Sequence, residues 1–417
     1  PDCLQNSQLR SQGMAAPCAR SFLLGCLAPA LLRDAWSARV SEDLEDGVLD
    51  TQKGGVKLCG DGSPDCWKNK VIYQILTDRF DTGEEGAGPC GDLKKYCGGT
   101  FQGIIKRLDY IRALGADAIW ISPVTENMPD GYHGYWPQSL TKVNSHFGSA
   151  DDLKQLVAEC HSRQMMVMVD VVANHMGKEW VDIKNLDAPF NSPDAFNDCV
   201  KCEGAGAKNE AYDNTNCKSK EAGCQCWVQD WNNPVQQLNC QLFGLPSLDQ
   251  NVPFVRRALK EYAASMHEVY GIDGLRLDTV PYVPKDFWHE FTTAGGVFSI
   301  GEVLTEHDSQ CLEYIGKPMD SVLNYPLYKV NVRTFLDGFA SMREISQEIK
   351  HQQGNYGDSF ALLGNFAECH DMDRLLQKTQ DLNQRRAFVL YVLAAEGIPI
   401  IYYGMEQAFQ GGPDQHD

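Results

Sequence analysis

The sequence predicts an α/β protein of the (β/α)8 TIM-barrel type. Short apolar runs, each typical of a buried parallel strand, alternate with amphipathic runs and without hairpin turns, which indicates βαβ units. Eight strand-like runs can be counted, the number in a closed barrel. Four of them end in acids and histidines, so these side chains are expected at one rim, where such barrels carry their active sites. The four stretches are residues 170–175, 274–278, 300–302 and 365–371.

The first half of the predicted barrel alternates between strands and helices. Each strand is a run of apolar residues, and each helix has apolar residues three or four positions apart. In the first helix we expect Ile105, Leu108 and Ile111 to share the buried face, and Gly115 to end the helix. The expected elements are strands 71–76, 117–122 and 165–170 and helices 102–114 and 150–163.

The alternation stops after the third strand. Residues 177–250 are rich in Asn, Asp, Gly and Cys, which predicts a cysteine-rich inserted lobe with a structure of its own. The barrel is expected to comprise residues 57–176 and 251–417. Because the chain ends soon after the eighth strand, we expect a barrel truncated at that point. The other expected elements are helix 253–270 and strands 272–278, 296–302, 321–324, 360–367 and 398–403.

Residues 1–56 show no sustained periodicity and are predicted to be leader and linker. At about residues 14–38, a short basic segment, an apolar run and small residues fit a secretory signal peptide, and a tail with a chance apolar patch is the alternative. Close cysteine pairs such as Cys199 and Cys202 do not form matched zinc knuckles, so they favour disulfides. We therefore expect a secreted protein or one of the endomembrane lumen.

The charge and the hydropathy exclude some partners. A net charge of −19 argues against nucleic acid and anionic membranes, because both would require clustered Lys and Arg. Apart from the N-terminal segment, no apolar run approaches the roughly 20 residues of a membrane span. A neutral polyol substrate is compatible with such an acidic protein, and we expect a monomer.

Two of the strand-end acids carry the chemical prediction. Asp278 and Glu302 are separated by one βαβ step, so their strands should be neighbours. Two facing carboxyl groups can cleave a glycosidic bond: one attacks the anomeric carbon, and the other protonates the leaving oxygen and then activates water. Asp371 is a third acid directed at the same opening. Surface acids at helix starts are the alternative, which the preceding apolar strands disfavour.

These motifs resemble those of a known family. The chain is similar to the glycoside hydrolases of the α-amylase family, and most closely to the fungal-type α-amylases. The resemblance runs from about residue 67 to the C-terminus, and it also includes residues 72–80, 97–103, 131–136 and 397–404. It implies a retaining enzyme that cleaves internal α-1,4-glucosidic bonds of starch-like glucans.

The resemblance implies a role for each side chain at the strand ends. Asp278 would be the nucleophile, and Glu302 the general acid/base. Asp371 would hold the distorted sugar. Arg276 lies on the same strand face as Asp278 and would keep its carboxylate ionised. Asp170 would be a supporting partner of Arg276.

Four further side chains would contact the substrate. Tyr135 would stack beneath the sugar, whose apolar C–H face suits an aromatic ring, and Trp136 follows it in the same motif. His175 and His370 would hydrogen-bond sugar hydroxyl groups. A histidine or tyrosine in an apolar setting is more often a core residue, but a strand end or a glycine-flanked loop favours a role in the site.

The family's structural calcium, between barrel and lobe, is the only cofactor that the resemblance implies. Asn174 matches one ligand. Leu238 stands where a glutamate is usual, and Ser247 where an aspartate is usual. Because calcium prefers several oxygen ligands, carboxylates above all, we expect a weak or absent calcium site.

The chain also departs from the family after the nucleophile. Pro281 and Tyr282 stand where fungal-type enzymes have Lys-His, which would contact sugar on the leaving-group side. The alternative function is therefore a 4-α-glucanotransferase, a transglycosylase of the same fold. A catalytically silent carbohydrate-binding homologue is disfavoured because all three acids are present. Cys311 matches a family disulfide position whose downstream partner is missing.

Overall fold

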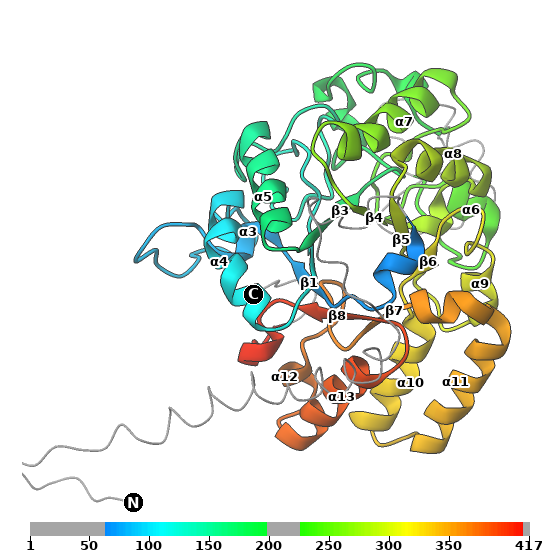
Figure 1. The fold of residues 1–417 in the computed structure, drawn as a ribbon. Coiled ribbons are helices and arrows are strands. Elements are labelled where there is room, and N and C mark those ends of the chain that lie inside the picture. Colours follow the sequence, from blue (N-terminus) through cyan, green and yellow to red (C-terminus); the bar gives the residue numbers. More distant parts are fainter. Residues whose placement is uncertain (1–62, 198–225, 412–417) are drawn as a thin grey trace, which may run out of the picture.

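The computed structural model describes residues 63–197 and 226–411 as a barrel of eight parallel strands with helices on its outside (Figure 1). The predicted leader and signal peptide, and the central part of the predicted lobe, lie outside the described residues. The strands are β1 (Ile72–Ile75), β2 (Ala118–Ile121), β3 (Met166–Val171), β4 (Gly274–Leu277), β5 (Phe298–Gly301), β6 (Ser321–Val322), β7 (Gly364–Phe366) and β8 (Ile398–Tyr402).

Helices follow most of the strands and cover the barrel. The longer ones are α4 (Phe101–Ala113), α5 (Ala150–Ser162), α7 (Pro253–Glu268), α8 (Lys285–Gly295), α10 (Tyr325–Phe335), α11 (Met342–Tyr356) and α13 (Leu382–Ala394). The short ones are α3 (Thr77–Phe80), α6 (Pro234–Asn239), α9 (Asp308–Leu312) and α12 (Leu375–Lys378). The three helices expected from apolar spacing correspond to α4, α5 and α7, each within two residues at both ends.

The sheet closes between β6 and β7 through a narrow seam. The strand order is β6-β5-β4-β3-β2-β1-β8-β7, and every paired neighbour is parallel. A single parallel bridge joins Leu323 to Gly364, and Asn324 N donates to Gly364 O at 2.8 Å. The (β/α)8 barrel predicted from the sequence is confirmed.

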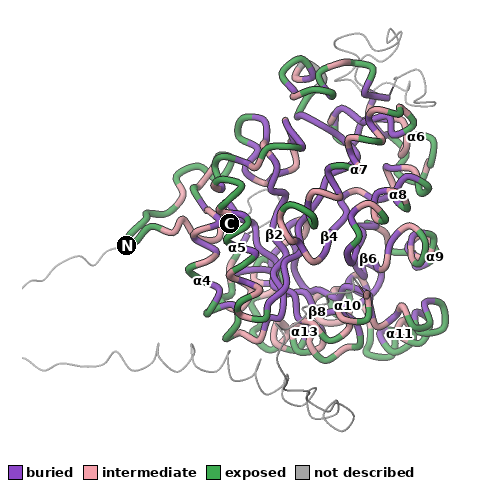
Figure 2. The backbone as a smooth tube through the Cα atoms, turned by 45° about the horizontal axis from the view of Figure 1, so that its top comes forward, coloured by how far each residue is buried: buried purple, intermediate pink, exposed green. Residues whose placement is uncertain are grey.

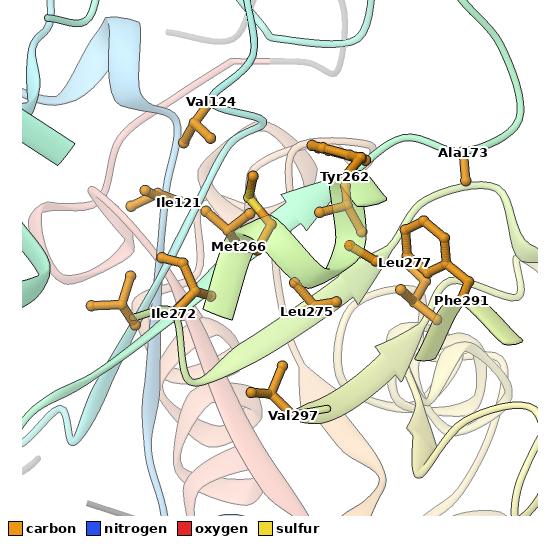
Figure 3. Packing of buried hydrophobic residues seen from close by; sticks show 14 of the residues in the cluster. Ile121, Val124, Ala173, Tyr262, Met266, Ile272, Leu275, Leu277, Phe291 and Val297 are labelled. Atoms are coloured by element: carbon orange, nitrogen blue, oxygen red, sulfur yellow. The ribbon is translucent and has the colours of Figure 1, made fainter. Parts of the chain in front are cut away.

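Alternation along the strands separates two cores. Ile119, Ile121 and Leu275 belong to the cluster between the sheet and its helices, whereas Trp120 and Met168 belong to a second cluster. Successive strand residues point to opposite faces, so every second residue faces the barrel interior. Figure 3 shows part of the first cluster, the one between the sheet and its helices, where it lies between β4 and helices α7 and α8. In Figure 2 the strands are almost wholly buried.

Side chains cap the N-terminal ends of helices α4 and α5. The Thr100 side chain accepts from Gly103 N at the start of α4, and Ser149 and Asp152 form a capping box at the start of α5. On the expected buried face of α4, Leu108 and Ile111 are fully buried, and Ile105 is half-buried and packs against the same cluster. Ile104, which was not expected there, is also fully buried, because it precedes Leu108 by four residues and so shares its face.

The lobe is described at 177–197 and 226–250. In these parts it consists of turns, short helices and isolated bridges, and α6 packs against the residues that follow β4. Cys90 and Cys97 form a disulfide outside the lobe. Cys311, whose pairing the sequence left open, is a free buried thiol in hydrogen-bonding contact with Tyr356.

Candidate active site

The polar side chains converge because they share one face of neighbouring strands. Arg276 on β4 is in register with Asp170 on β3 and with Ile300 on β5. Asp278 and Glu302 each follow an inward-facing residue by two positions, so they also face the barrel interior. Backbone hydrogen bonds hold both residues just beyond the strand ends. Asp278 N donates to Val171 O at 3.1 Å, and Glu302 N donates to Leu277 O at 2.9 Å.

Arg276 lies at the centre of this carboxylate cluster and is completely buried. Its Nη1 is 2.8 Å from Asp278 Oδ1 and 3.1 Å from Asp170 Oδ1. Its Nη2 is 3.1 Å from Glu302 Oε2, an ion pair without hydrogen-bond geometry, and 4.0 Å from Asp371 Oδ2. The pairing of Arg276 with Asp170 and Asp278, expected from the sequence, is present in the structure.

The three carboxyl groups predicted to carry the chemistry lie around Arg276, at 2.8 Å for Asp278, 3.1 Å for Glu302 and 4.0 Å for Asp371. The Asp278 and Glu302 side chains are 8% and 11% exposed, whereas that of Asp371 is 36% exposed.

Burial raises the pKa of each acid in the cluster. It raises the pKa of Glu302, against the attraction of Arg276 and with repulsion from Asp278. Burial and the charge of Glu302 raise the pKa of Asp371 well above its usual value. Burial also raises the pKa of Asp170 to about 7. One guanidinium cannot neutralise four carboxylates in a buried site, so burial and mutual repulsion disfavour the ionisation of all four together.

Thr279 is a site residue that the sequence analysis did not identify. Its backbone N donates to Glu302 Oε2 at 3.0 Å, and its hydroxyl donates to Asp278 Oδ2 at 3.1 Å. It adopts a left-handed conformation with φ of 49°, which a β-branched residue rarely takes. This strain occurs where the chain turns directly after Asp278, and it directs both donors of Thr279 at the two acids.

Tyr135 and His370 form one unit above Asp170. The Tyr135 hydroxyl donates to Asp170 Oδ2 at 2.8 Å and lies 2.8 Å from His370 Nε2. The two rings are stacked, with centroids 5.4 Å apart. His370 Nδ1 lies 2.8 Å from Gln74 Nε2, a partner on β1 that the sequence analysis also missed. The inward-facing position of Gln74 on an otherwise apolar strand was the available signal.

The remaining predicted substrate contacts lie less centrally. His175 is buried, and its Nε2 lies 2.9 Å from Tyr135 O, so it supports the loop that carries Tyr135. Burial lowers the pKa of His175 to about 4. Trp136 is half-buried, contacts His133 edge-to-face, and lies 4.4 Å from Lys178 Nζ. The described contacts of Trp136 do not reach the carboxylates.

A buried ion pair fixes the loop that carries His370 and Asp371. Arg374 Nη1 lies 3.1 Å from Glu368 Oε2 and donates to Tyr403 O at 2.6 Å. Its guanidinium lies 3.9 Å from the centre of the Tyr402 ring. The pair therefore holds both ends of the loop against β8.

The residues considered for calcium do not assemble a metal site. Within 63–197 and 226–411, no group of three or more His, Cys, Asp or Glu side chains could hold a metal ion. Leu238 and Ser247 contribute no carboxylate beside Asn174. The donor set therefore does not fit a cation that prefers several carboxylate oxygens.

Comparison with known proteins identifies the family. The protein-family model described as "Alpha amylase, catalytic domain" matches residues 74–416 of the chain. The chain belongs to the alpha-amylase family. Members of this family are glycoside hydrolases, and the match covers all four strand-end stretches. The resemblance drawn from the sequence motifs is thereby confirmed.

Individual relatives agree with this assignment. The chain is 35% identical to an alpha-amylase of Saccharomycopsis fibuligera, over 85% of this chain and 69% of the relative. It is 37% identical to alpha-amylase 1 of Schwanniomyces occidentalis, over 84% and 66%. Among solved structures, an alpha-amylase from Malbranchea cinnamomea superposes with a TM-score of 0.74 at 33% identity, over 85% of this chain and 72% of that one. The chain spans 54% to 69% of the length of the yeast alpha-amylases it matches.

Proposed function

We propose that this protein is a retaining glycoside hydrolase that cleaves internal α-1,4-glucosidic bonds of starch-like glucans. The observation that carries the proposal is the position of the Asp278 and Glu302 carboxyl groups: they follow adjacent strands, and both are held by Arg276 and by Thr279. Inverting enzymes separate their two carboxyl groups by roughly 6.5–9.5 Å to admit a water, whereas retaining enzymes hold them only about 5 Å apart. Two carboxyl groups that share one guanidinium and one threonine favour retention.

The proposed reaction assigns opposite protonation states to the two acids. Asp278, paired with Arg276 and with the Thr279 hydroxyl, attacks the anomeric carbon as a carboxylate. Glu302, whose pKa burial raises, donates its proton to the leaving glycosidic oxygen. The resulting glycosyl-enzyme ester is broken when Glu302, now ionised, takes a proton from the attacking water.

The other predicted residues act on the sugar in this proposal. Asp371 is the most exposed of the three acids, so it can accept hydrogen bonds from sugar hydroxyl groups as the ring flattens. Tyr135 presents an aromatic surface beside His370, and His370 contacts Asp371 at 3.2 Å. These groups bind and orient the sugar while Asp278 forms and releases the bond to the anomeric carbon and Glu302 transfers the proton.

The experiment compares starch hydrolysis by the wild type, Glu302→Gln and Glu306→Gln. Removing the proton donor is expected to lower kcat by at least about 100-fold, a typical contribution of general acid–base catalysis. Glu306 is an exposed acid four residues further on, paired with Lys329 at 3.7 Å, and its amide variant should keep wild-type activity. Equal activity of Glu302→Gln and the wild type would refute the assignment.

The proposed location is the cell exterior or the endomembrane lumen. The Cys90–Cys97 disulfide and the disulfide-bonded Cys66, Cys226 and Cys240 support an oxidising compartment. No helix in the described parts of the chain is long and apolar enough to cross a membrane.

A transglycosylase is the second candidate, and the surface beside Glu302 favours it. Tyr282 packs against Cys226, and burial, together with the charge of Glu302, raises the pKa of its phenol to about 12. Leu304, two residues after Glu302, is 58% exposed. Apolar surface at the leaving-group side suits the C–H faces of an acceptor sugar better than it suits water.

Product analysis separates the two candidates. Maltopentaose is incubated with the wild type and the products are resolved by length. Hydrolysis alone yields only shorter chains, which is the expected result for the main proposal. Products longer than maltopentaose would show transfer to a sugar hydroxyl group and would favour the second candidate.

A further inference from the structure

Backbone hydrogen bonds tie the described part of the lobe to the barrel. Leu248 N donates to Asn174 O at 2.8 Å, and Asn197 N donates to Ser247 O at 2.8 Å. His175 and Ser247 form an antiparallel bridge. Three segments, one after β3 and two from the lobe, therefore lie side by side, and the middle one is the segment of Ser247.

The Asn197 side chain joins the lobe segments to one another. Its amide Nδ2 lies 3.1 Å from Leu238 O, 3.1 Å from Ser247 Oγ and 2.9 Å from Leu248 O, and donates to these oxygens. Asn197 and Ser247 are 6% and 2% exposed. The lobe oxygens that face this junction thus already have a neutral hydrogen-bond donor.

This arrangement conflicts with the calcium ion that the family implies. Leu238 and Ser247 stand where the family pattern has acids, and calcium takes six to eight oxygen ligands, carboxylates above all. Asn174 Oδ1 is buried and makes no hydrogen bond, but a single amide oxygen does not make a calcium site. A cation beside Ser247 Oγ and the two carbonyls would also lie against the N–H groups of Asn197.

We propose that the Asn197 amide takes the place of calcium by fixing the lobe segment of Ser247 and Leu248, which pairs with Asn174 and His175 after β3, and that the fold of this protein requires no divalent cation there. The amide supplies the donors that satisfy buried acceptors on two lobe segments. Truncating it leaves those oxygens buried without partners, which is costly in a dry site. Fixing this segment also supports His175, which forms the bridge with Ser247.

Thermal unfolding of the whole chain tests this proposal. The wild type is dialysed against EDTA and then measured with EDTA or with excess CaCl2. The two Tm values are expected to agree within about 1 °C, since a ligand stabilises only the state that binds it. A Tm that falls on chelation and recovers with CaCl2 would overturn the proposal.

A matched pair of variants tests the role of the amide itself. Asn197→Ala is expected to lower Tm by at least about 3 °C, because buried acceptors lose their donor. Asn191→Ala, at an exposed lobe position, should leave Tm unchanged. Equal Tm values for Asn197→Ala and the wild type would contradict the proposal. If Asn197→Ala is insoluble while Asn191→Ala folds, the amide is required for folding, and the chelation arm on the wild type still decides on the metal.

Discussion

Arg276 organises the active site at the scale of single residues. Its two terminal nitrogens contact three different acids, Asp170, Asp278 and Glu302, at 2.8–3.1 Å. A planar guanidinium can serve several carboxylates in fixed directions, whereas an ammonium is a point charge on a flexible stem. Because burial disfavours the ionisation of all these acids together, the charge of Arg276 favours the ionised form of the acids nearest to it. The acid nearest to it is Asp278, the proposed nucleophile.

The Arg276→Lys variant tests this role. The charge is retained, but one ammonium cannot contact Asp278 and Glu302 in the same geometry, so kcat is expected to fall by about 100-fold or more. The matched control is Arg333→Lys, an exposed position on α10, which should keep wild-type kcat. Steady-state kinetics on a maltooligosaccharide measure both variants. A kcat for Arg276→Lys within twofold of the wild type would show that contact of the two guanidinium nitrogens with different acids is unimportant.

The sequence identified the acids that follow strands and the loop residues that belong to a recognisable motif, but it missed Gln74 and Thr279. Asp278, Glu302 and Arg276 were predictable because strand alternation fixes the face they occupy. Thr279 was not, because its left-handed backbone follows from packing after the strand and not from its residue type. Trp136 was predicted from its motif, yet its described contacts are with His133 and Lys178.

At the scale of elements, the seam between β6 and β7 is the weakest part of the barrel wall. Other neighbouring strands pair over two to four residues, whereas this seam has one bridge, from Leu323 to Gly364. A Cβ atom at Gly364 would lie 2.7 Å from Ile300 Cδ1 and 2.9 Å from Ile400 Cδ1. Glycine therefore lets the barrel interior pack at the seam. A short strand that contains glycine has few apolar residues to mark its ends. The sequence therefore predicted a strand at 360–367, whereas β7 begins four residues later, at Gly364.

Gly364→Val is expected to destabilise the fold by about 1–3 kcal/mol, because its side chain would overpack the barrel interior. Gly354→Ala is the matched comparison: its Cβ would meet no atom within 4 Å inside α11, so it should stabilise the fold by about 0.5–1 kcal/mol. Urea unfolding measures both changes. A neutral or stabilising Gly364→Val would mean that the seam tolerates side-chain volume and is not tightly packed.

At the scale of the whole molecule, the barrel followed from the sequence because its signals repeat. The apolar strands and the spacing of strand-end acids each occur several times, so an error in one element does not alter the fold class. The lobe has no such repetition. Its described parts are joined by isolated bridges and side chains such as Asn197, whose contacts depend on the folded chain. The barrel and the family are confirmed, and the role of each site residue stays a prediction.

The covalent intermediate on Asp278 is the most direct test of the proposed mechanism. Glu302→Gln is incubated with α-maltosyl fluoride, whose fluoride leaves without a proton donor, while the missing base slows hydrolysis of the ester. Intact-protein mass spectrometry and peptide mapping are predicted to find one maltosyl group on Asp278. Release of β-configured maltose without an adduct, or an adduct on another residue, would contradict the account.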